Sequence, residues 1–480
     1  MTELPPPYPH QLEGARRLAE HPNYAILFEM GAGKSRTLIL DLEAKLKSGA
    51  VKNFLLTAPS GSYRNWSREL ETWLSPELYK QLVIFVWVSG KSKPKDFEAF
   101  LSYTGDRPRA LLMNIEALSR VDRAKEGIVT FLKSADTLWT VDESQAIKSP
   151  TSLRTKFILK IAPLAKYRRI LTGLITPENP MNLFSQASFL DPKLLGQNSF
   201  FSFRARYAIT KKVDFKKTGG KPVEVIVGFR NLPELNQKLE KFSYRVRTED
   251  VVCLPPRIYM PIRYVEMTPE QTKMYAEMKR LAMTQIEGSY VTSQIAAGVL
   301  TKLHAILMGH AIDENGELHH VPSNRVNAVL ELLEDFGGKA LLWASSPHLL
   351  RKLATALEEN YGPESVMRYW GETTSDERVE NVERFQNDPK CRFAVLNQSV
   401  GGEGINLTAA TLVCYVSNSW RNSERQQSEA RAHRIGQERP VTYVDFAVEK
   451  SMEEKLIVAL RKKQELSALV NGDTLKDWII

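Results

Sequence analysis

Residues 24–46 read YAILFEMGAGKSRTLILDLEAKL, an apolar run followed by a glycine-rich turn and a helix-like stretch. This order predicts a strand, a phosphate-binding loop and a helix, with the loop formed by Gly31, Ala32, Gly33, Lys34 and Ser35. Glycines let the backbone wrap closely around a polyphosphate, and the amides at the start of the helix point at its oxygens. We expect Lys34 to reach the β- and γ-phosphates of ATP and the Ser35 hydroxyl to ligate Mg²⁺. Because Phe28 stands where such loops usually carry their first glycine, a plain turn between strand and helix is the alternative.

A second apolar run, Leu138–Val141, ends in the acidic pair Asp142-Glu143. Acidic residues at the carboxyl end of a buried strand lie where a parallel sheet opens onto its ligand. We therefore expect Asp142 to hold Mg²⁺ through water and Glu143 to polarise the water that attacks ATP. Taken alone, such a pair also occurs at the start of a helix.

Short apolar runs, each followed by enough residues for a helix, recur in both halves of the chain. This alternation predicts an α/β fold with two parallel-sheet lobes in tandem. The predicted strands are Tyr24–Met30, Asn53–Ala58, Leu82–Val88, Ala110–Ile115, Leu138–Val141 and Arg169–Leu171 in the first half, and Ala340–Ala344, Phe393–Leu396, Leu412–Val416 and Val441–Phe446 in the second.

The region between the two sets of strands differs in character. We expect a first lobe over 1–197, a small basic, mainly helical insertion over 198–256 and a second lobe over 257–480. Residues 201–250 hold 12 Lys and Arg against 6 Asp and Glu. This excess fits either a solvated loop and helix face or a polyanion-binding surface. The prolines of Leu254-Pro255-Pro256 indicate the lobe boundary, and Asp313-Glu314-Asn315-Gly316 predicts a hairpin turn.

Composition limits the class of protein. The 480 residues carry a net charge of +9, and no apolar run approaches the roughly 20 residues of a membrane span. Cys253, Cys391 and Cys414 have no paired spacing, so neither a disulfide scaffold nor a zinc site is expected. These features favour a cytoplasmic setting, or a nuclear one in a eukaryote, without a membrane partner.

Several motifs, in order along the chain, resemble one family. The tetrad DESQ at 142–145 resembles that of superfamily-two helicases. The stretch QSEARAHRIGQ at 427–437 closely resembles the sixth motif of the Swi/Snf-type DNA translocases. Further similarities are YPHQ at 8–11, LTAP at 56–59, Arg378 with Phe385, GGEGINLT at 401–408 and SNSWRN at 417–422. The resemblance covers roughly residues 5 to 470.

The resemblance implies two RecA-like lobes, with ATP and Mg²⁺ bound between them and double-stranded DNA as the partner. It assigns Arg431 and Arg434 as arginine fingers, and their spacing of three puts both on one face of a helix. Gln11 and Tyr8 would contact the adenine, and Gly404 would lie near the γ-phosphate. Residues expected to couple DNA binding to hydrolysis are Gln145, Thr172, Gly173 and Gln427.

For DNA, the resemblance implies contacts to the phosphate backbone rather than to base edges. The candidates are Thr57, Ala58, Pro59, Asn114, Ser345, Ser346 and Thr408. Trp66 could pack on a sugar or base, or belong to the core. The chain departs from the family at Gln145, where His is usual, and at Leu174-Ile175, where Thr-Pro is usual.

Three functions are compatible with these residues. The first is an ATP-dependent translocase on double-stranded DNA, with target choice supplied by a protein partner. The second is a strand-separating, fork-remodelling or annealing helicase. The third is an ATP-binding interaction module that seldom turns over, against which Lys34, Glu143, Arg431 and Arg434 argue.

Overall fold

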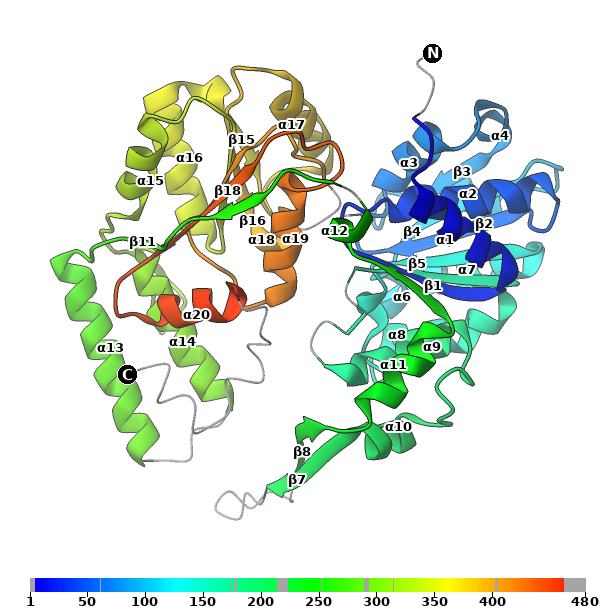
Figure 1. The fold of residues 1–480 in the computed structure, drawn as a ribbon, viewed down its shortest axis with the longest axis horizontal. Helices are drawn as coiled ribbons and strands as arrows, with labels where there is room; N and C mark the ends of the chain where they lie inside the picture. The colour runs from blue at the N-terminus through cyan, green and yellow to red at the C-terminus, as the bar shows by residue number, and fades with distance from the viewer. Residues whose placement is uncertain are drawn as a thin grey trace. The chain divides into compact units, whose positions relative to one another are not determined.

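The computed structural model describes residues 5–60, 62–173, 175–176, 179–213, 223–251, 253–288, 293–313, 315–401 and 405–461. The chain divides into two compact units, Met1–Cys253 and Leu254–Ile480 (Figure 1). The division falls at the proline pair that follows Leu254, where the sequence predicts the lobe boundary.

The first unit is built on a parallel sheet of seven strands in the order β3-β4-β2-β5-β6-β1-β9. Its strands are β1 Asn23–Phe28, β2 Asn53–Ala58, β3 Val83–Val86, β4 Arg109–Asn114, β5 Thr137–Asp142, β6 Tyr167–Leu171 and β9 Ser243–Val246. The register pairs Asp142 with Leu171 and Ala58 with Asn114. Because all seven strands run parallel, their carboxyl ends lie along one edge of the sheet.

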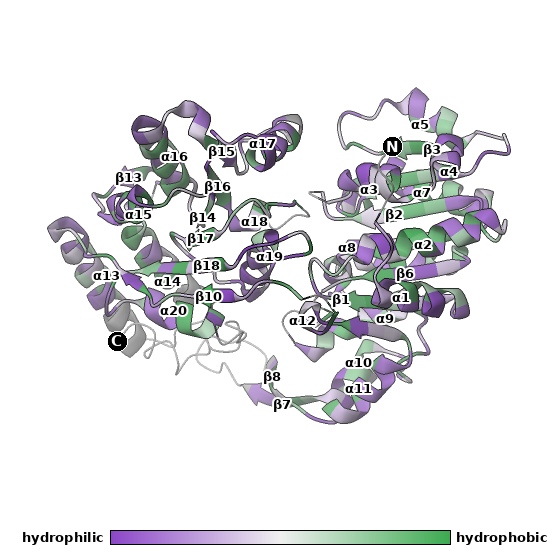
Figure 2. Cartoon of the chain, turned by 45° about the horizontal axis from the view of Figure 1, so that its top comes forward, coloured by the Kyte–Doolittle hydropathy of each residue, from purple (hydrophilic) through white to green (hydrophobic). Residues whose placement is uncertain are grey.

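Two hydrophobic cores cover the two faces of this sheet. Alternate residues of β1 face opposite sides, with Ile26 in one core and Leu27 in the other. Strands buried on both faces need near-continuous apolar runs, which the sequence has, and Figure 2 shows the hydrophobic residues concentrated there. The helices are α1 Pro9–Glu20, α2 Lys34–Lys47, α3 Asn65–Trp73 and α4 Pro76–Gln81 on one side, and α5 Pro94–Leu101, α6 Ala117–Arg120, α7 Asp122–Ser134, α8 Leu153–Ile161 and α9 Leu183–Leu190 on the other.

Residues 198–256, predicted as a mainly helical insertion, are mixed in structure and are not a compact unit of their own. They contain α10 Phe200–Tyr207, a hairpin of β7 Ala208–Val213 and β8 Val223–Phe229, α11 Leu232–Glu240, β9 and α12 Thr248–Val251. β9 pairs in parallel with β1, so this region completes the first sheet. β9 was not predicted, because its four residues, SYRV, are too short a run to be distinguished in the sequence.

The second unit has a parallel sheet in the order β10-β18-β17-β14-β16-β15, with β11 also paired to β18. Its strands are β10 Arg257–Tyr259, β11 Arg263–Tyr264, β14 Ala340–Ala344, β15 Val366–Tyr369, β16 Phe393–Asn397, β17 Leu412–Tyr415 and β18 Val441–Ala447. The predicted fold class, an α/β chain with two parallel-sheet lobes, is therefore confirmed. The predicted hairpin is present as β12 His310–Ile312 and β13 Leu318–His320, although Glu314 lies outside the described residues.

Again, helices cover both faces of the sheet. Leu342 packs with α15 and α16, whereas Trp343, its neighbour on β14, packs on the opposite side with α17 and the end of α19. The helices are α13 Pro269–Gly288, α14 Ser293–Leu307, α15 Arg325–Glu334, α16 Pro347–Tyr361, α17 Ser375–Asn387, α18 Gln398–Gly401, α19 Asn422–Ala432 and α20 Met452–Arg461. Within the described ranges, no helix combines the length and the apolar character needed to cross a membrane.

Candidate active site

The predicted phosphate-binding loop lies between β1 and α2, at the carboxyl edge of the first sheet. Gly31 and Gly33 both have φ of +84°, a region that only glycine adopts without strain. A Cβ on Gly33 would lie 2.0 Å from Nε2 of Gln11, so the loop also needs glycine for space. α2 begins at Lys34, whose Nζ donates to the carbonyl of Phe28 at 3.1 Å. The Ser35 hydroxyl belongs to the first turn of the same helix.

The start of α1 packs against this loop. Gln11 is buried, and its Oε1 accepts a hydrogen bond from the backbone N–H of Tyr8 at 3.0 Å. His10 is buried beside it, with Nε2 2.8 Å from the carbonyl oxygen of Ala32. The His10 ring stacks on Tyr8 and meets the edge of Phe28. A role for His10 was not predicted, because its contact with the Ala32 carbonyl joins residues 22 positions apart in the sequence.

Asp142, at the end of β5, is held by two donors. Nε1 of Trp66 donates to Oδ2 at 2.9 Å, and the backbone N–H of Glu143 donates to Oδ1 at 2.9 Å. Burial, followed by the charge of Glu143, raises the pKa of Asp142 to about 6, although Trp66 and Lys34 oppose the shift. Trp66 is itself buried, so it is a core aromatic that orients Asp142 and not an exposed stacking platform.

A chain of hydrogen bonds joins Glu143 to the end of β6. Nε2 of Gln145 donates to Oε2 of Glu143 at 2.7 Å, and the Thr172 hydroxyl donates to Oε1 of Gln145 at 2.8 Å. We call these three residues the relay. Glu143 has φ of +48°, a conformation that costs a non-glycine residue about 1–3 kcal/mol and often occurs at functional sites. Gln145, which stands where the family usually has His, thus bonds to two residues of the first unit.

The segments on either side of the relay are fixed by residues that were not predicted. The Ser144 hydroxyl donates to Oε1 of the fully buried Gln186 at 2.6 Å, and Nε2 of Gln186 donates to the carbonyls of Ile175 and Asn182. Gly173 lies against β1: a Cβ there would approach the Phe28 carbonyl to 3.4 Å. Leu174, part of the departure noted above, lies outside the described residues.

In the second unit, Arg431 and Arg434 converge on one carbonyl. Their Nη1 atoms donate to the oxygen of Ile405 at 3.4 Å and 3.2 Å respectively. The expectation that both lie on a single helix face is wrong, because α19 ends at Ala432 and Arg434 follows in the turn. Gln427 lies on α19, half-buried, and Gly404 lies outside the described residues.

Gln437 fixes this turn and was not singled out from the sequence. Its Nε2 lies within 3.0 Å of the carbonyl oxygens of Thr408, Ala410 and Ala432. The side chain is buried, so these bonds hold the segment that follows Ile405 against the end of α19.

The residues predicted to contact DNA lie near strand ends in both units. They differ in whether the side chain could still bind a ligand. Thr57 is fully buried, and its hydroxyl accepts from Nε1 of Trp139 at 3.1 Å, so only its backbone could serve a ligand. Ala58 is buried and Pro59 half-buried. Oδ1 of Asn114 accepts from the Ser89 hydroxyl at 3.2 Å.

The candidates of the second unit are also engaged with their surroundings. The Ser345 hydroxyl lies 3.0 Å from that of Ser417, and the Ser346 hydroxyl lies 3.5 Å from Nε2 of His310. The Thr408 hydroxyl accepts from Nε2 of Gln386 at 3.2 Å.

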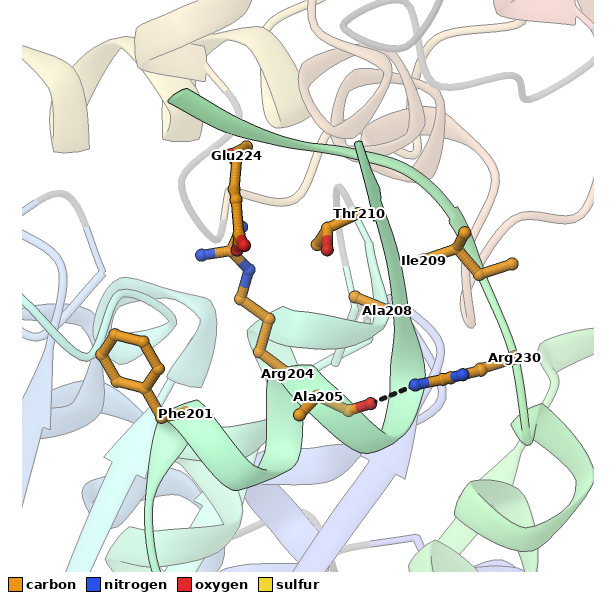
Figure 3. A pocket seen from close by; sticks show the side chains of 8 residues that line it. All are labelled: Phe201, Arg204, Ala205, Ala208, Ile209, Thr210, Glu224 and Arg230. Carbon is orange, nitrogen blue, oxygen red and sulfur yellow. Dashed lines mark hydrogen bonds and ion pairs between the residues drawn. The ribbon is translucent and has the colours of Figure 1, made fainter. Parts of the chain in front are cut away.

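Two arginines of the lysine- and arginine-rich segment 201–250 are paired with glutamates. Arg204 pairs with Glu224, and Arg206 with Glu234. Figure 3 shows Arg204 and Glu224 beside a hollow of about 380 Å³ between α10 and the hairpin, with Arg230 donating to the Ala205 carbonyl. Both glutamates are already among the 6 acidic residues counted in this segment, so its excess of positive charge remains.

The first unit has the donor set that ATP and a divalent cation require. The loop at Gly33 is a cradle that a Cβ would fill, and the Ser35 hydroxyl and the Asp142 carboxyl are hard oxygen ligands of the kind Mg²⁺ prefers. Burial, followed by the charge of Glu143, raises the pKa of Asp142, and a bound cation would oppose that shift.

A phosphate-binding loop after β1, an Asp-Glu pair after β5 and a second parallel-sheet unit with paired arginines define the helicase-like P-loop ATPases. Comparison with known families agrees. The SNF2-related domain matches residues 10–308, and the helicase conserved C-terminal domain matches residues 324–436. The chain belongs to the SNF2-related family and is a helicase-like ATPase.

Similar proteins have been characterised in several organisms. The chain is 27% identical over 390 residues to the DNA annealing helicase and endonuclease ZRANB3 of Homo sapiens, covering 80% of the chain and 33% of that protein. It is 27% identical over 453 residues to the putative ATP-dependent helicase/translocase YwqA of Bacillus subtilis, covering 92% and 45%. The chain thus spans about a third to just under half the length of these relatives.

Among solved structures, the Sulfolobus solfataricus SWI2/SNF2 ATPase core in complex with dsDNA is 24% identical in sequence. The comparison has a TM-score of 0.42 and covers 98% of this chain and 94% of that one.

Proposed function

We propose that this chain is an ATP-driven motor that moves along double-stranded DNA. The observation that carries the proposal is the relay. It links Glu143, the candidate for activating water, to Thr172 at the end of a neighbouring strand. A motor must connect hydrolysis to movement, and a relay between two strand ends provides a path for that coupling.

In the proposed reaction, the chain's own groups bind and orient ATP. Lys34 would exchange the Phe28 carbonyl for the β- and γ-phosphates, and Glu143 would orient the attacking water. Ser35 and Asp142 would hold Mg²⁺, which when bound neutralises charge on the phosphates. Arg431 and Arg434 would supply positive charge to the γ-phosphoryl oxygens as bonds break. Tyr8 and Gln11 would contact the adenine.

We propose that the DNA is gripped through its phosphates. Pro59 and Asn114 follow β2 and β4, at the same sheet edge as the nucleotide residues, and Ser345, Ser346 and Thr408 are the candidates of the second unit. Such contacts bind DNA without reading its base sequence. A protein partner would therefore select the DNA site on which the chain acts. Binding should weaken steeply with added salt.

The test is ATP turnover of the purified chain without nucleic acid and with single-stranded DNA, double-stranded DNA or RNA. We expect the largest stimulation with double-stranded DNA, together with displacement of a third strand from a triplex and no separation of a tailed duplex. Turnover that is equal in all four conditions would contradict the proposal.

A second candidate is supported by the similarity to a protein named as a DNA annealing helicase. Under this alternative, the chain would reanneal complementary strands in the presence of ATP. Faster annealing of a partly melted duplex, without triplex displacement, would favour it over translocation.

A further inference from the structure

His10, in the first turn of α1, is held in one orientation by two aromatic rings. Its imidazole stacks on the ring of Tyr8, with centroids 5.8 Å apart, and meets the edge of the Phe28 ring at 5.5 Å. Phe28 is fully buried and stands where phosphate-binding loops usually carry a glycine, so this chain has an aromatic ring next to the loop. Because His10 is buried between the two rings, its side chain has little freedom to turn.

This fixed ring bonds to the phosphate-binding loop. Nε2 of His10 lies 2.8 Å from the carbonyl oxygen of Ala32, and since a carbonyl oxygen only accepts, Nε2 carries the proton and donates. Ala32 is fully buried, and among the described residues no backbone N–H donates to its carbonyl. The backbone bonds of α2 begin one residue later, where the Gly33 carbonyl accepts from the N–H of Thr37 at 3.1 Å. His10 therefore supplies a bond that the helix does not.

The orientation of the Ala32 carbonyl decides the direction of the next N–H group. The peptide bond between Ala32 and Gly33 is trans, so its C=O and N–H point in opposite directions. With the carbonyl turned toward His10 on α1, the N–H of Gly33 points away from α1. Gly33 has φ of +84°, and backbone N–H groups next to such a left-handed residue form the concave sites that bind anions.

We propose that His10 is a positioning residue for ATP. The hydrogen bond from its Nε2 fixes the peptide between Ala32 and Gly33, so that the N–H of Gly33 is directed at a phosphate oxygen. The inference rests on the proposed function, since it takes the loop to be the phosphate site. α1 would then act on both ends of the nucleotide, because Tyr8 and Gln11 at its start are the proposed contacts of the adenine.

A ligand without a base separates a role in phosphate binding from a role in adenine binding. Inorganic tripolyphosphate has the phosphate chain of ATP but no adenosine. If His10 acts through the loop, its loss must weaken the binding of ATP and of tripolyphosphate by the same factor. Loss of an adenine contact would weaken the binding of ATP alone.

The test measures the displacement of a fluorescent ATP analogue from the full chain by ATP and by tripolyphosphate, each with Mg²⁺. His10→Phe keeps a ring beside Tyr8 and Phe28 but removes the donor, and it should weaken the binding of both ligands about three- to tenfold. His10→Gln has a side-chain N–H that can donate to the Ala32 carbonyl, so it should recover most of the lost affinity for both.

The matched control is His21→Phe, at an exposed histidine that follows the other end of α1 and stacks on Tyr24. It should bind both ligands as the wild type does. Thermal unfolding without ligand identifies a purely structural role for His10. A lower unfolding temperature in His10→Phe, with wild-type affinity for both ligands, would overturn the inference, and so would weaker binding of ATP alone.

Lys34→Ala distinguishes a failure of this inference from a failure of the proposed function. It removes the side chain proposed to reach the phosphates, so it should weaken the binding of tripolyphosphate more than His10→Phe does. Wild-type affinity for tripolyphosphate in Lys34→Ala would overturn the loop as the phosphate site, and this inference with it. Weaker binding in Lys34→Ala but not in His10→Phe would overturn the role of His10 alone.

Discussion

The buried carboxyl of Asp142 lowers the stability of the folded chain at neutral pH. An acid whose pKa is higher in the folded than in the unfolded chain stabilises the fold only while it is protonated. For Asp142 that contribution to stability is complete below pH 3.8, the usual pKa of the group, and it is lost as the pH rises through about 6. At neutral pH the ionised carboxyl is therefore a destabilising group, and the proposed role of Asp142 as a Mg²⁺ ligand would explain why the site keeps it.

We expect Asp142→Asn to stabilise the chain above pH 6 when metal and nucleotide are absent. The amide oxygen still accepts from Trp66 and the buried charge is removed, but the bond from the Glu143 N–H is lost, so the net gain is on the order of 1 kcal/mol. Thermal unfolding in a chelating buffer measures the effect, which should shrink as the pH falls below about 6. Asp136→Asn, at an exposed aspartate paired with Lys166, is the control. A variant less stable at every pH would contradict the expectation.

For single residues, the sequence predicts a role when that role depends on the residues next to it in the sequence. Lys34 and Asp142 follow directly from a loop or a strand end. His10, Trp66 and Gln186 could not be predicted, since each acts through a contact with a residue far along the sequence. Burial creates those contacts, and no short motif records them.

At the scale of elements, the relay connects the ends of β5 and β6. The backbone pairs Asp142 with Leu171, and the side chain of Gln145 adds a second connection between Thr172 and Glu143. A signal from DNA that displaces the end of β6 would then change the position of the Glu143 carboxylate.

We expect Thr172→Val to uncouple DNA from hydrolysis. The substitution keeps the shape of the side chain but removes the bond to Gln145, worth about 1 kcal/mol. Stimulation of ATP turnover by DNA should fall about three- to tenfold, while ATP binding stays the same. Thr130→Val is the control, because it removes the hydroxyl of an exposed threonine on α7. Unchanged stimulation in Thr172→Val would show that the relay is not a path of coupling.

Strands were easier to predict than the ends of other elements. β2 and β14 match their predicted ranges because strands buried on both faces need unbroken apolar runs. β15 and the short edge strands β10 and β11 were missed, and so was the end of α19 before Arg434. Those boundaries depend on tertiary bonds, such as the ones Gln437 makes to three carbonyls.

At the scale of the whole molecule, each unit carries its own buried charge network. Arg169 and Lys45 share Asp41 in the first unit, and Arg425 pairs with Asp445 in the second. These pairs are almost fully buried, so removing one partner would leave a buried charge uncompensated. Loss of either partner would therefore destabilise the unit that holds it.

The proposed function also requires that both units take part in hydrolysis, and a variant of Arg431 tests this. Arg431→Ala should leave ATP binding intact, because the phosphate-binding loop lies in the first unit, but should lower DNA-stimulated turnover by about 10³-fold or more. Arg368→Gln, at an exposed pair with Glu358, is the control for loss of a charge from the second unit. Circular dichroism should show that both variants are folded. If Arg431→Ala turned over ATP at the normal rate, hydrolysis would belong to the first unit alone, and movement of the second could not be driven by it.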